Sequence, residues 1–436
     1  MSRSLRIPSF SAFSGRDLSI PILLLVYRIL LDVSYIDLVA TVYHHNDYEM
    51  GGSLGQCVES YLFLFLVFLF LPKGQDRFSK IALQLLFVIG FVPISSFFGV
   101  GEGDRLWFYA CNGFFLILSS LTSLLNRECS DLPVGGNRRF TEYELGSVLF
   151  LLPLLTILAA GYFNGFFLNL DLLSIYGIRE QFEGVQDKIP FGGYFMNWAG
   201  KVAMPFLFLV TIFGRSGVRY FHLLLLGVFL LLLFSLAGHK SYLFIPFLAV
   251  GVGILIRRRA FLRELIGVMV LVIVACLLVF QLGGDSLPGS IFIRRFFFAP
   301  AKLSWYYHEL FTKDLLFLSH SVLEGVTQYP LEMNNSLYVA REFLGENMNA
   351  NNGIFSDGLK NFGLLGLYFW AILLAALLKV CDRLTAGKDS IVLWSLLAVG
   401  GYTFINGALF PTLLTHGFFL SLLLAFIYPM KRSYGR

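Results

Sequence analysis

Long runs of apolar residues recur along the whole chain, and each is close to the length of a bilayer crossing. A helix rises about 1.5 Å per residue, so about 20 apolar residues span the hydrocarbon core of a membrane. Only 14% of the 436 residues are charged, whereas soluble domains carry roughly a quarter. A soluble enzyme, a secreted disulfide-rich protein and a disordered chain are therefore excluded, and the sequence predicts an all-α polytopic integral membrane protein.

The apolar runs, taken in order, predict about twelve transmembrane helices. With the N-terminus inside, 21 of the 33 Lys and Arg residues fall in inner segments, as the positive-inside rule requires. Both termini are then expected on the inner, cytoplasmic side of the membrane. The expected helices lie at 18–42, 57–72, 80–98, 106–125, 146–165, 197–214, 219–237, 241–256, 264–282, 362–380, 390–409 and 412–430.

This topology divides the chain into five parts. Residues 1–165 would hold the first five helices, 197–282 the next four, and 362–436 the last three with a cytoplasmic tail. Between them, 166–196 and 283–361 form two long outer loops, the second with interfacial helices, and long loops are the natural place for a function. The five cysteines show no paired or metal-like spacing, so no disulfide, metal or other cofactor is expected, and the basic clusters mark topology rather than nucleic-acid binding.

Twelve basic residues are not explained by topology and need another reason to lie on the outer side or within the bilayer. They are Arg28, Arg105, Arg179, Lys188, Lys201, Lys240, Arg294, Arg295, Lys302, Lys313, Arg341 and Lys360.

The first outer loop begins with a leucine-rich stretch, 168–175, which predicts a helix lying at the interface, followed by a turn-rich stretch. Tyr176 and Arg179 come next. Arg179 is either an anion ligand or a solvated charge paired with Glu180 or Glu183. Both interpretations stay open.

His239 and Lys240 lie in the short connection between two apolar segments. A charge at the edge of the bilayer is costly unless it snorkels or has a partner. Lys240 is therefore a snorkelling residue or a substrate ligand, and the His239 ring either serves the substrate or bonds a backbone carbonyl.

The second outer loop presents Arg294, Arg295 and Lys302 from an apolar surface, with a turn predicted at Ala299 and Pro300. A guanidinium binds phosphate oxygens in a bidentate manner, so these cations suit a lipid pyrophosphate at headgroup depth. The alternative is an interfacial anchor for anionic lipid.

The remaining candidates in this loop are polar or aromatic side chains suited to sugars. Trp305 and Tyr306 would serve as stacking platforms or as an aromatic belt. Amides can bind sugar hydroxyls, although an Asn-rich stretch is also typical of turns. These candidates are Arg341, Asn349, Asn351 and Asn352, with Asp357 as a proton acceptor. In the first apolar segment, Arg28 and Asp32 stand four residues apart, which predicts an internal ion pair.

The motifs GHKSYLF, IRRFFFAPAKL and MNANNGIFSDGLKNFGLLG, after the loop with Tyr176 and Arg179, together resemble the Wzy-type O-antigen polymerases of Gram-negative bacteria. The likeness is clearest over 160–370. Some members carry an Arg followed eleven positions later by Gly in each large loop, whereas this chain has Pro190 and Trp305 at those positions. The resemblance implies a GT-C-like glycosyltransferase in the inner membrane with its active face in the periplasm.

Such an enzyme transfers the growing glycan from undecaprenyl pyrophosphate to the non-reducing end of a new lipid-linked repeat unit. Negative charge develops on the leaving pyrophosphate, and fixed cations stabilise it without a metal. Arg179, Arg294, Arg295 and Lys240 are the candidates for this role, with Asp357, His239 and Glu309, in that order, as candidates for the general base. The resemblance also implies a chain-length-determining co-polymerase as a partner. An O-antigen ligase, a flippase for the lipid-linked oligosaccharide, and a scaffold are the alternatives.

Overall fold

The computed structural model describes residues 18–128, 140–169, 175–214, 220–312, 314–321, 323, 326–345, 349–350, 353–388 and 390–430. Within these ranges the chain is almost entirely helical, and strand pairing is limited to one isolated antiparallel bridge between Lys388 and Met430.

The α-helices are α1 Ser19–Ser34, α2 Leu54–Phe70, α3 Phe78–Leu86, α4 Val92–Val100, α5 Arg105–Glu128, α6 Glu142–Asn164, α7 Ile175–Lys188, α8 Gly192–Trp198, α9 Met204–Phe213, α10 Tyr220–Ala237, α11 Lys240–Arg257, α12 Phe261–Gly283, α13 Leu287–Gly289, α14 Ala299–Phe311, α15 Asn335–Leu344, α16 Ile354–Thr385, α17 Ser390–Asn406, α18 Leu409–Leu413 and α19 Phe418–Ile427. The π-helical segments are η1 Tyr35–Ala40, η3 Phe87–Phe91, η4 Ala199–Ala203 and η5 Ser290–Phe298, and η2 His44–Asn46 is a 3-10 turn.

Each of the twelve apolar segments overlaps a helix of the structure. Eight helices in the described ranges are long and apolar enough to cross a membrane, and three shorter apolar helices accompany them. The chain is therefore a multi-pass helical membrane protein.

The distribution of apolar side chains agrees with a lipid-facing surface. The helix Phe78–Val100, which joins α3, η3 and α4, is buried along its apolar length, whereas most of α12 lies on the outside. Large apolar side chains such as Leu54, Leu282 and Leu365 are more than 80% exposed. A soluble monomer rarely leaves so much apolar surface in water, but lipid tails solvate it without cost.

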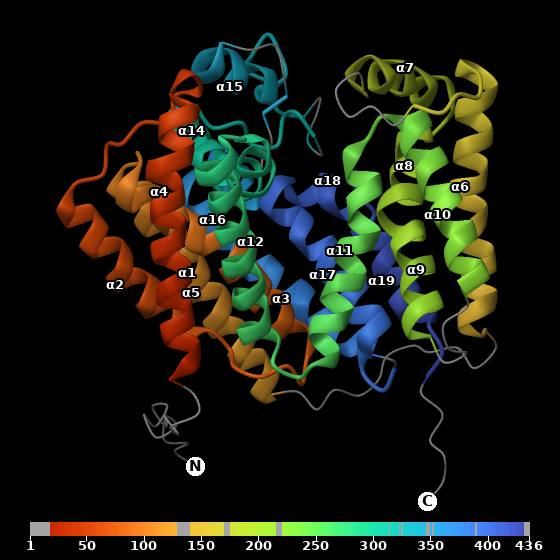
Figure 1. Ribbon diagram of the computed structural model, residues 1–436, viewed down its shortest axis with the longest axis horizontal. Coiled ribbons are helices and arrows are strands. Elements are labelled where there is room, and N and C mark those ends of the chain that lie inside the picture. The colour runs from red at the N-terminus through yellow and green to blue at the C-terminus, as the bar shows by residue number, and fades with distance from the viewer. Residues whose placement is uncertain are drawn as a thin grey trace, which may run out of the picture.

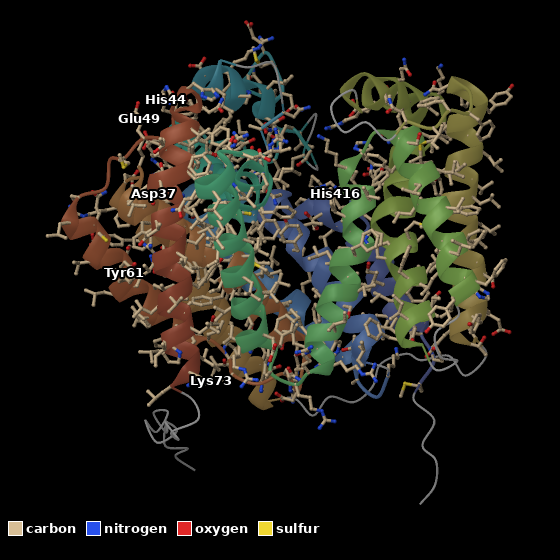
Figure 2. The ribbon with its side chains drawn as sticks, viewed as in Figure 1. Asp37, His44, Glu49, Tyr61, Lys73 and His416 are labelled. Carbon is tan, nitrogen blue, oxygen red and sulfur yellow. The ribbon has the colours of Figure 1, made fainter. Side chains whose placement is uncertain are left out.

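The helices run roughly side by side between two ends of the molecule (Figure 1). We call the end that carries α7 and α15 the α15 end; the short helix α7 lies across the bundle there, as an interfacial helix does. The opposite end, where α1 begins and Lys73 is located, is the Lys73 end (Figure 2). The basic connection between α11 and α12 lies at the Lys73 end as well.

Two local predictions were wrong. The expected turn at Ala299 and Pro300 is instead helical, because α14 continues directly from η5 and both Phe298 and Ala299 have helical backbone angles. The stretch after Tyr176, expected to be rich in turns, forms the helix α7, Ile175–Lys188. Most of the residues expected to form the interfacial helix, 170–174, lie outside the described residues.

Helix α16 begins eight residues before the predicted segment, and a kink divides it at Phe362 and Gly363. Gly363 has a φ of +63°, which side chains with a Cβ rarely adopt. The first part, 354–361, therefore packs as a separate helical piece at the entrance to the long apolar helix, and it carries Asp357.

The predicted ion pair between Arg28 and Asp32 is confirmed. Arg28 is fully buried, and it also donates to Ser60 Oγ at 2.8 Å. Asp32 accepts from Ser96 at 2.6 Å and from Tyr61 at 2.7 Å. Hydrogen bonds on both partners compensate the cost of removing two charges from water, so this pair joins α1 to α2 and α4.

Candidate functional site

Three of the unexplained cations lie on π-helical segments. Lys201 is on η4, and Arg294 and Arg295 are on η5. A π-helical turn gives up regular hydrogen-bond geometry and is frequent at functional sites. The candidate site is therefore described from the side chains that these two segments carry.

The first group, which we call the α7 cluster, consists of Arg179, Lys201, His239 and His416. Lys201 Nζ lies 2.8 Å from Nδ1 of His416, which precedes α19. His239 occupies the N-cap position of α11, and the centre of its ring lies 5.8 Å from that of Phe182 on α7. The cluster thus joins α7, η4, α11 and the connection before α19.

Electrostatic repulsion within the α7 cluster is visible at His239. Burial, followed by the positive charges of Arg179 and Lys201, lowers the pKa of His239 to about 3. The ring is therefore neutral at pH 7. A bound anion would offset the repulsion, which is the behaviour expected of an anion site.

Arg179 is exposed and forms an ion pair with Glu183, with Nε and Oε1 2.8 Å apart. This is one of the two partners expected for a solvated charge. An exposed pair of this kind contributes little to stability, so Arg179 can exchange Glu183 for an incoming anion at low cost. Lys240 begins α11 next to His239, at the border of the cluster.

The second group, the η5 cluster, consists of Arg294, Arg295 and Lys302. The guanidinium of Arg294 lies 4.3 Å from the ring centre of Tyr43 and donates to Ser290 at 3.1 Å. Its Nε is buried and has no hydrogen-bond partner among the described residues. The guanidinium therefore retains a donor, and Arg295 beside it is exposed.

Lys302 has a structural environment that differs from the predicted one. Its side chain is buried, and Nζ donates to the carbonyl oxygens of Asn46, at 2.7 Å, and Asp47. Burial lowers the pKa of Lys302 to about 8. Two donors of the ammonium thus hold the connection after α1 in place, which favours a structural role for Lys302 over the predicted role as a substrate ligand.

An apolar groove adjoins η5. It has a volume of about 250 Å³, and its walls include Cys276 and Val279 of α12 and Phe292 of η5. Phe292 lines this groove from the same π-helical segment that carries Arg294 and Arg295.

Asp357 is buried in a complete network. Its Oδ2 accepts from Trp370 Nε1 at 2.9 Å and from the amide of Leu409 at 3.0 Å, and its Oδ1 accepts from Asn361 at 3.0 Å. Lys360 lies 3.7 Å away. Because both oxygens accept from protein donors, Asp357 joins α16 to α18, which favours a structural role over the predicted role as general base.

The aromatic candidates are only partly available to a ligand. Tyr306 is buried and stacks on Phe343 with ring centres 3.8 Å apart, so it cannot also stack on a sugar. Trp305 is half-buried and donates to Glu309 at 3.2 Å.

The polar candidates lie on or near α15. Arg341 and Asn349 are exposed; Asn349 accepts from Ser336 at 2.8 Å, and Arg341 donates to the sulfur of Met333. Asn351, Asn352 and the side chain of Tyr176 lie outside the described residues.

Two members of the α7 cluster were not selected from the sequence. The sequence marks Lys201 as a cation that topology does not explain but indicates no role for it, and no sequence pattern points to His416. A cation inside an apolar helix is itself a signal of function. The pairing with His416 spans 215 positions and is visible only in the structure.

In the described parts of the chain, no group of three His, Cys, Asp or Glu side chains is arranged to hold a metal ion. The fold thus defines a polytopic helical membrane protein with two cation clusters. Comparisons with protein-family models, curated proteins and solved structures found no match.

Proposed function

We propose that this protein is a glycosyltransferase that polymerises lipid-linked oligosaccharides, as an O-antigen polymerase does. The observation that carries the proposal is the α7 cluster, in which Arg179, Lys201, His239 and His416 converge and in which, among the described side chains, Glu183 is the one carboxylate that forms an ion pair with a member. Such a group suits a ligand with concentrated negative charge, and a pyrophosphate ester is the ligand of this kind that a membrane enzyme meets at headgroup depth.

The chemistry follows from the charges. The acceptor hydroxyl attacks the anomeric carbon while the bond from that carbon to the pyrophosphate oxygen breaks. The hydroxyl proton passes to a base, and undecaprenyl pyrophosphate leaves with an additional negative charge, which Arg179 and Lys201 stabilise. His239 is neutral and lies beside these cations, so it replaces Asp357 as the first candidate for the base.

The η5 cluster is the proposed binding site for the pyrophosphate of a second polyprenyl substrate. Arg294 and Arg295 lie on the same π-helical segment that supplies Phe292 to the apolar groove, a combination that suits a pyrophosphate joined to a hydrocarbon chain. A polymerase handles two such lipids, a donor and an acceptor. A ligase needs only one, and a flippase would place its cations around a central cavity, so the presence of two clusters favours the polymerase.

The proposal includes the finer topology. Twelve helices would cross the bacterial inner membrane, with the Lys73 end and both termini in the cytoplasm and the α15 end in the periplasm. The 166–196 and 283–361 segments would then be the periplasmic loops of a GT-C-like enzyme that works with a chain-length-determining co-polymerase.

Deletion of the gene tests the function. We expect lipopolysaccharide capped with a single repeat unit and no ladder of longer glycans on a gel, and complementation should restore the ladder. Complete absence of any repeat would contradict a polymerase and favour a ligase or flippase.

Substitution of Arg294 tests the site. Arg294→Ala should abolish the ladder at a normal protein level, because the phosphate loses a bidentate donor. Arg105→Ala is the matched control: Arg105 is exposed, pairs with Glu59 at 3.1 Å and belongs to neither cluster. A full ladder with Arg294→Ala would remove this residue from the site.

A further inference from the structure

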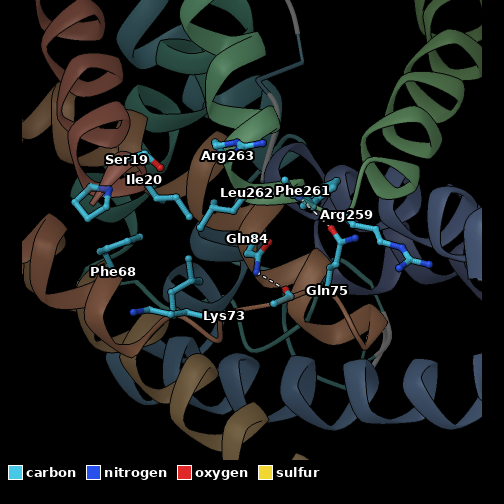
Figure 3. Close-up of a pocket in the computed structure, with 14 residues that line it drawn as sticks. Ser19, Ile20, Phe68, Lys73, Gln75, Gln84, Arg259, Phe261, Leu262 and Arg263 are labelled. Carbon is cyan, nitrogen blue, oxygen red and sulfur yellow. Dashed lines mark hydrogen bonds between the residues drawn. The ribbon is translucent and has the colours of Figure 1, made fainter. Parts of the chain in front are cut away.

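A pocket of about 360 Å³ opens at the Lys73 end, far from both cation clusters. The start of α1, the end of α2, the connection that follows α2, and the connection between α11 and α12 form its walls (Figure 3). The proposed glycan chemistry leaves this pocket without a role.

The walls combine two kinds of side chain. Lys73, Arg259 and Arg263 line the pocket and are exposed to solvent. Ile20 and Phe68 supply apolar surface on the side of α1 and α2. Lipid-facing residues of the same helices, such as Ile22 and Phe70, are more than half exposed on the outside. A ligand that fits has an anionic head and a hydrocarbon chain.

Gln84 adds a more specific requirement. It lines the pocket and is only 1% exposed. Its Nε2 donates to the carbonyl oxygens of Pro72, at 3.0 Å, and Gly74, at 2.8 Å, which fixes the orientation of the amide. Its Oε1 is buried and has no hydrogen-bond partner among the described residues. Figure 3 shows this amide at the centre of the lining side chains.

The positive-inside rule explains why cations lie at this end, but it does not explain the amide. A buried acceptor without a donor costs about 1 to 3 kcal/mol. The atom is closed to solvent, so a ligand hydroxyl would remove that cost by displacing a lining side chain and donating to Oε1 while the ligand phosphate meets the cations.

We propose that this pocket binds an anionic phospholipid with a hydroxyl-bearing head, of the phosphatidylglycerol class, from the leaflet at the Lys73 end. The phosphodiester contacts Arg259, Arg263 and Lys73, a head-group hydroxyl donates to Gln84 Oε1, and the acyl chains leave along α1 and α2.

Native mass spectrometry of the purified full chain in detergent tests this site with lipids of matched chain length. Phosphatidylglycerol, phosphatidylmethanol and phosphatidylcholine are offered at equal concentrations. Phosphatidylmethanol carries the same charge without the hydroxyls. We expect phosphatidylglycerol to be retained about 10-fold more than phosphatidylmethanol, as one additional hydrogen bond to a buried acceptor provides, and phosphatidylcholine to be retained least. Equal retention of the two anionic lipids would overturn the proposal.

Variants locate the site. Arg259→Gln with Arg263→Gln should remove the preference for anionic lipid. Arg257→Gln with Arg258→Gln, an equal loss of charge nearby at residues that do not line the pocket, should keep it. Equal effects of the two pairs would show general electrostatic attraction and overturn the site. Gln84→Leu should abolish only the preference for phosphatidylglycerol over phosphatidylmethanol.

A soluble competitor separates a lipid from a free phosphate ester. Glycerol 3-phosphate should displace the lipid only at a concentration at least about 100-fold higher, because it lacks the buried chains. Displacement at equal concentration would identify a soluble phosphate ester as the ligand.

Discussion

Lys201 and His416 meet across 215 positions of sequence, with Nζ and Nδ1 2.8 Å apart. The ammonium can only donate, so Nδ1 of His416 accepts and its other nitrogen carries the proton. This contact orients the Lys201 ammonium against the neutral ring of His416 within the α7 cluster.

Lys201→Met should abolish the glycan ladder while the protein level stays normal, because the leaving pyrophosphate loses a fixed charge. Lys201→Arg should keep part of the ladder, since the charge remains. Gel analysis of lipopolysaccharide and an immunoblot of the membranes make the measurement. A full ladder with Lys201→Met would exclude this residue from the mechanism.

The ion pair of Arg28 and Asp32 leads to a prediction on stability. Asp32→Asn should lower the free energy of unfolding by about 3 to 5 kcal/mol, because a fully buried guanidinium loses its counter-ion. The double variant Arg28→Met with Asp32→Leu should recover most of this loss. Thermal unfolding of the purified protein in detergent compares the three proteins, and a double variant less stable than Asp32→Asn would contradict the prediction.

Asp357→Ala should act through folding. Trp370 Nε1 and the amide of Leu409 would lose their acceptor, so we expect a loss of about 3 kcal/mol or more and less protein in the membrane. Glu309→Ala, at an exposed site in the neighbouring segment, should leave the protein level unchanged. A normal level of Asp357→Ala protein without any ladder would return Asp357 to the list of bases.

The pKa of His239 predicts a dependence of stability on pH. It is about 3 in the folded protein and about 6.5 in an unfolded chain. Between these values the unfolded state binds a proton that the folded state does not, so stability falls as pH decreases below 6.5. The His239 contribution at pH 5 is a loss of roughly 1 to 2 kcal/mol relative to pH 7.5. His239→Asn should lack this part of the pH dependence, as melting temperatures at the two pH values would show; equal pH dependence would disprove the assignment.

The apolar segments were predictable because each carries its own signal. A run of about 20 apolar residues has few alternatives to a membrane helix, so all twelve segments overlap helices. The residues at which helices begin and end depend on single side chains and were less predictable. Pro300 predicts a turn, but the helix continues through it from η5 into α14.

The candidate site was predictable only in part. The position of a charged residue beside an apolar segment is visible in the sequence, but the partner that its side chain contacts in the fold is not. Arg179 and His239 were selected from their positions beside apolar segments, and the structure places both in one cluster with Lys201. Lys302 and Asp357 are equally conspicuous in the sequence, yet the carbonyl oxygens of Asn46 and Asp47 and the indole of Trp370 occupy them. Those partners come from distant segments, which no local pattern reveals.

The π-helical segment η4 makes the α7 cluster sensitive to chain length. A π-helical turn accommodates one residue more than an α-helical turn, and each residue of an α-helix turns the following side chains by about 100°. Loss of a single residue within Ala199–Ala203 would let the segment relax to a regular α-helix and rotate α8 against α9. Lys201 would then point away from His416 although no side chain of the cluster had been replaced, so spacing in this segment constrains the protein as strictly as residue identity.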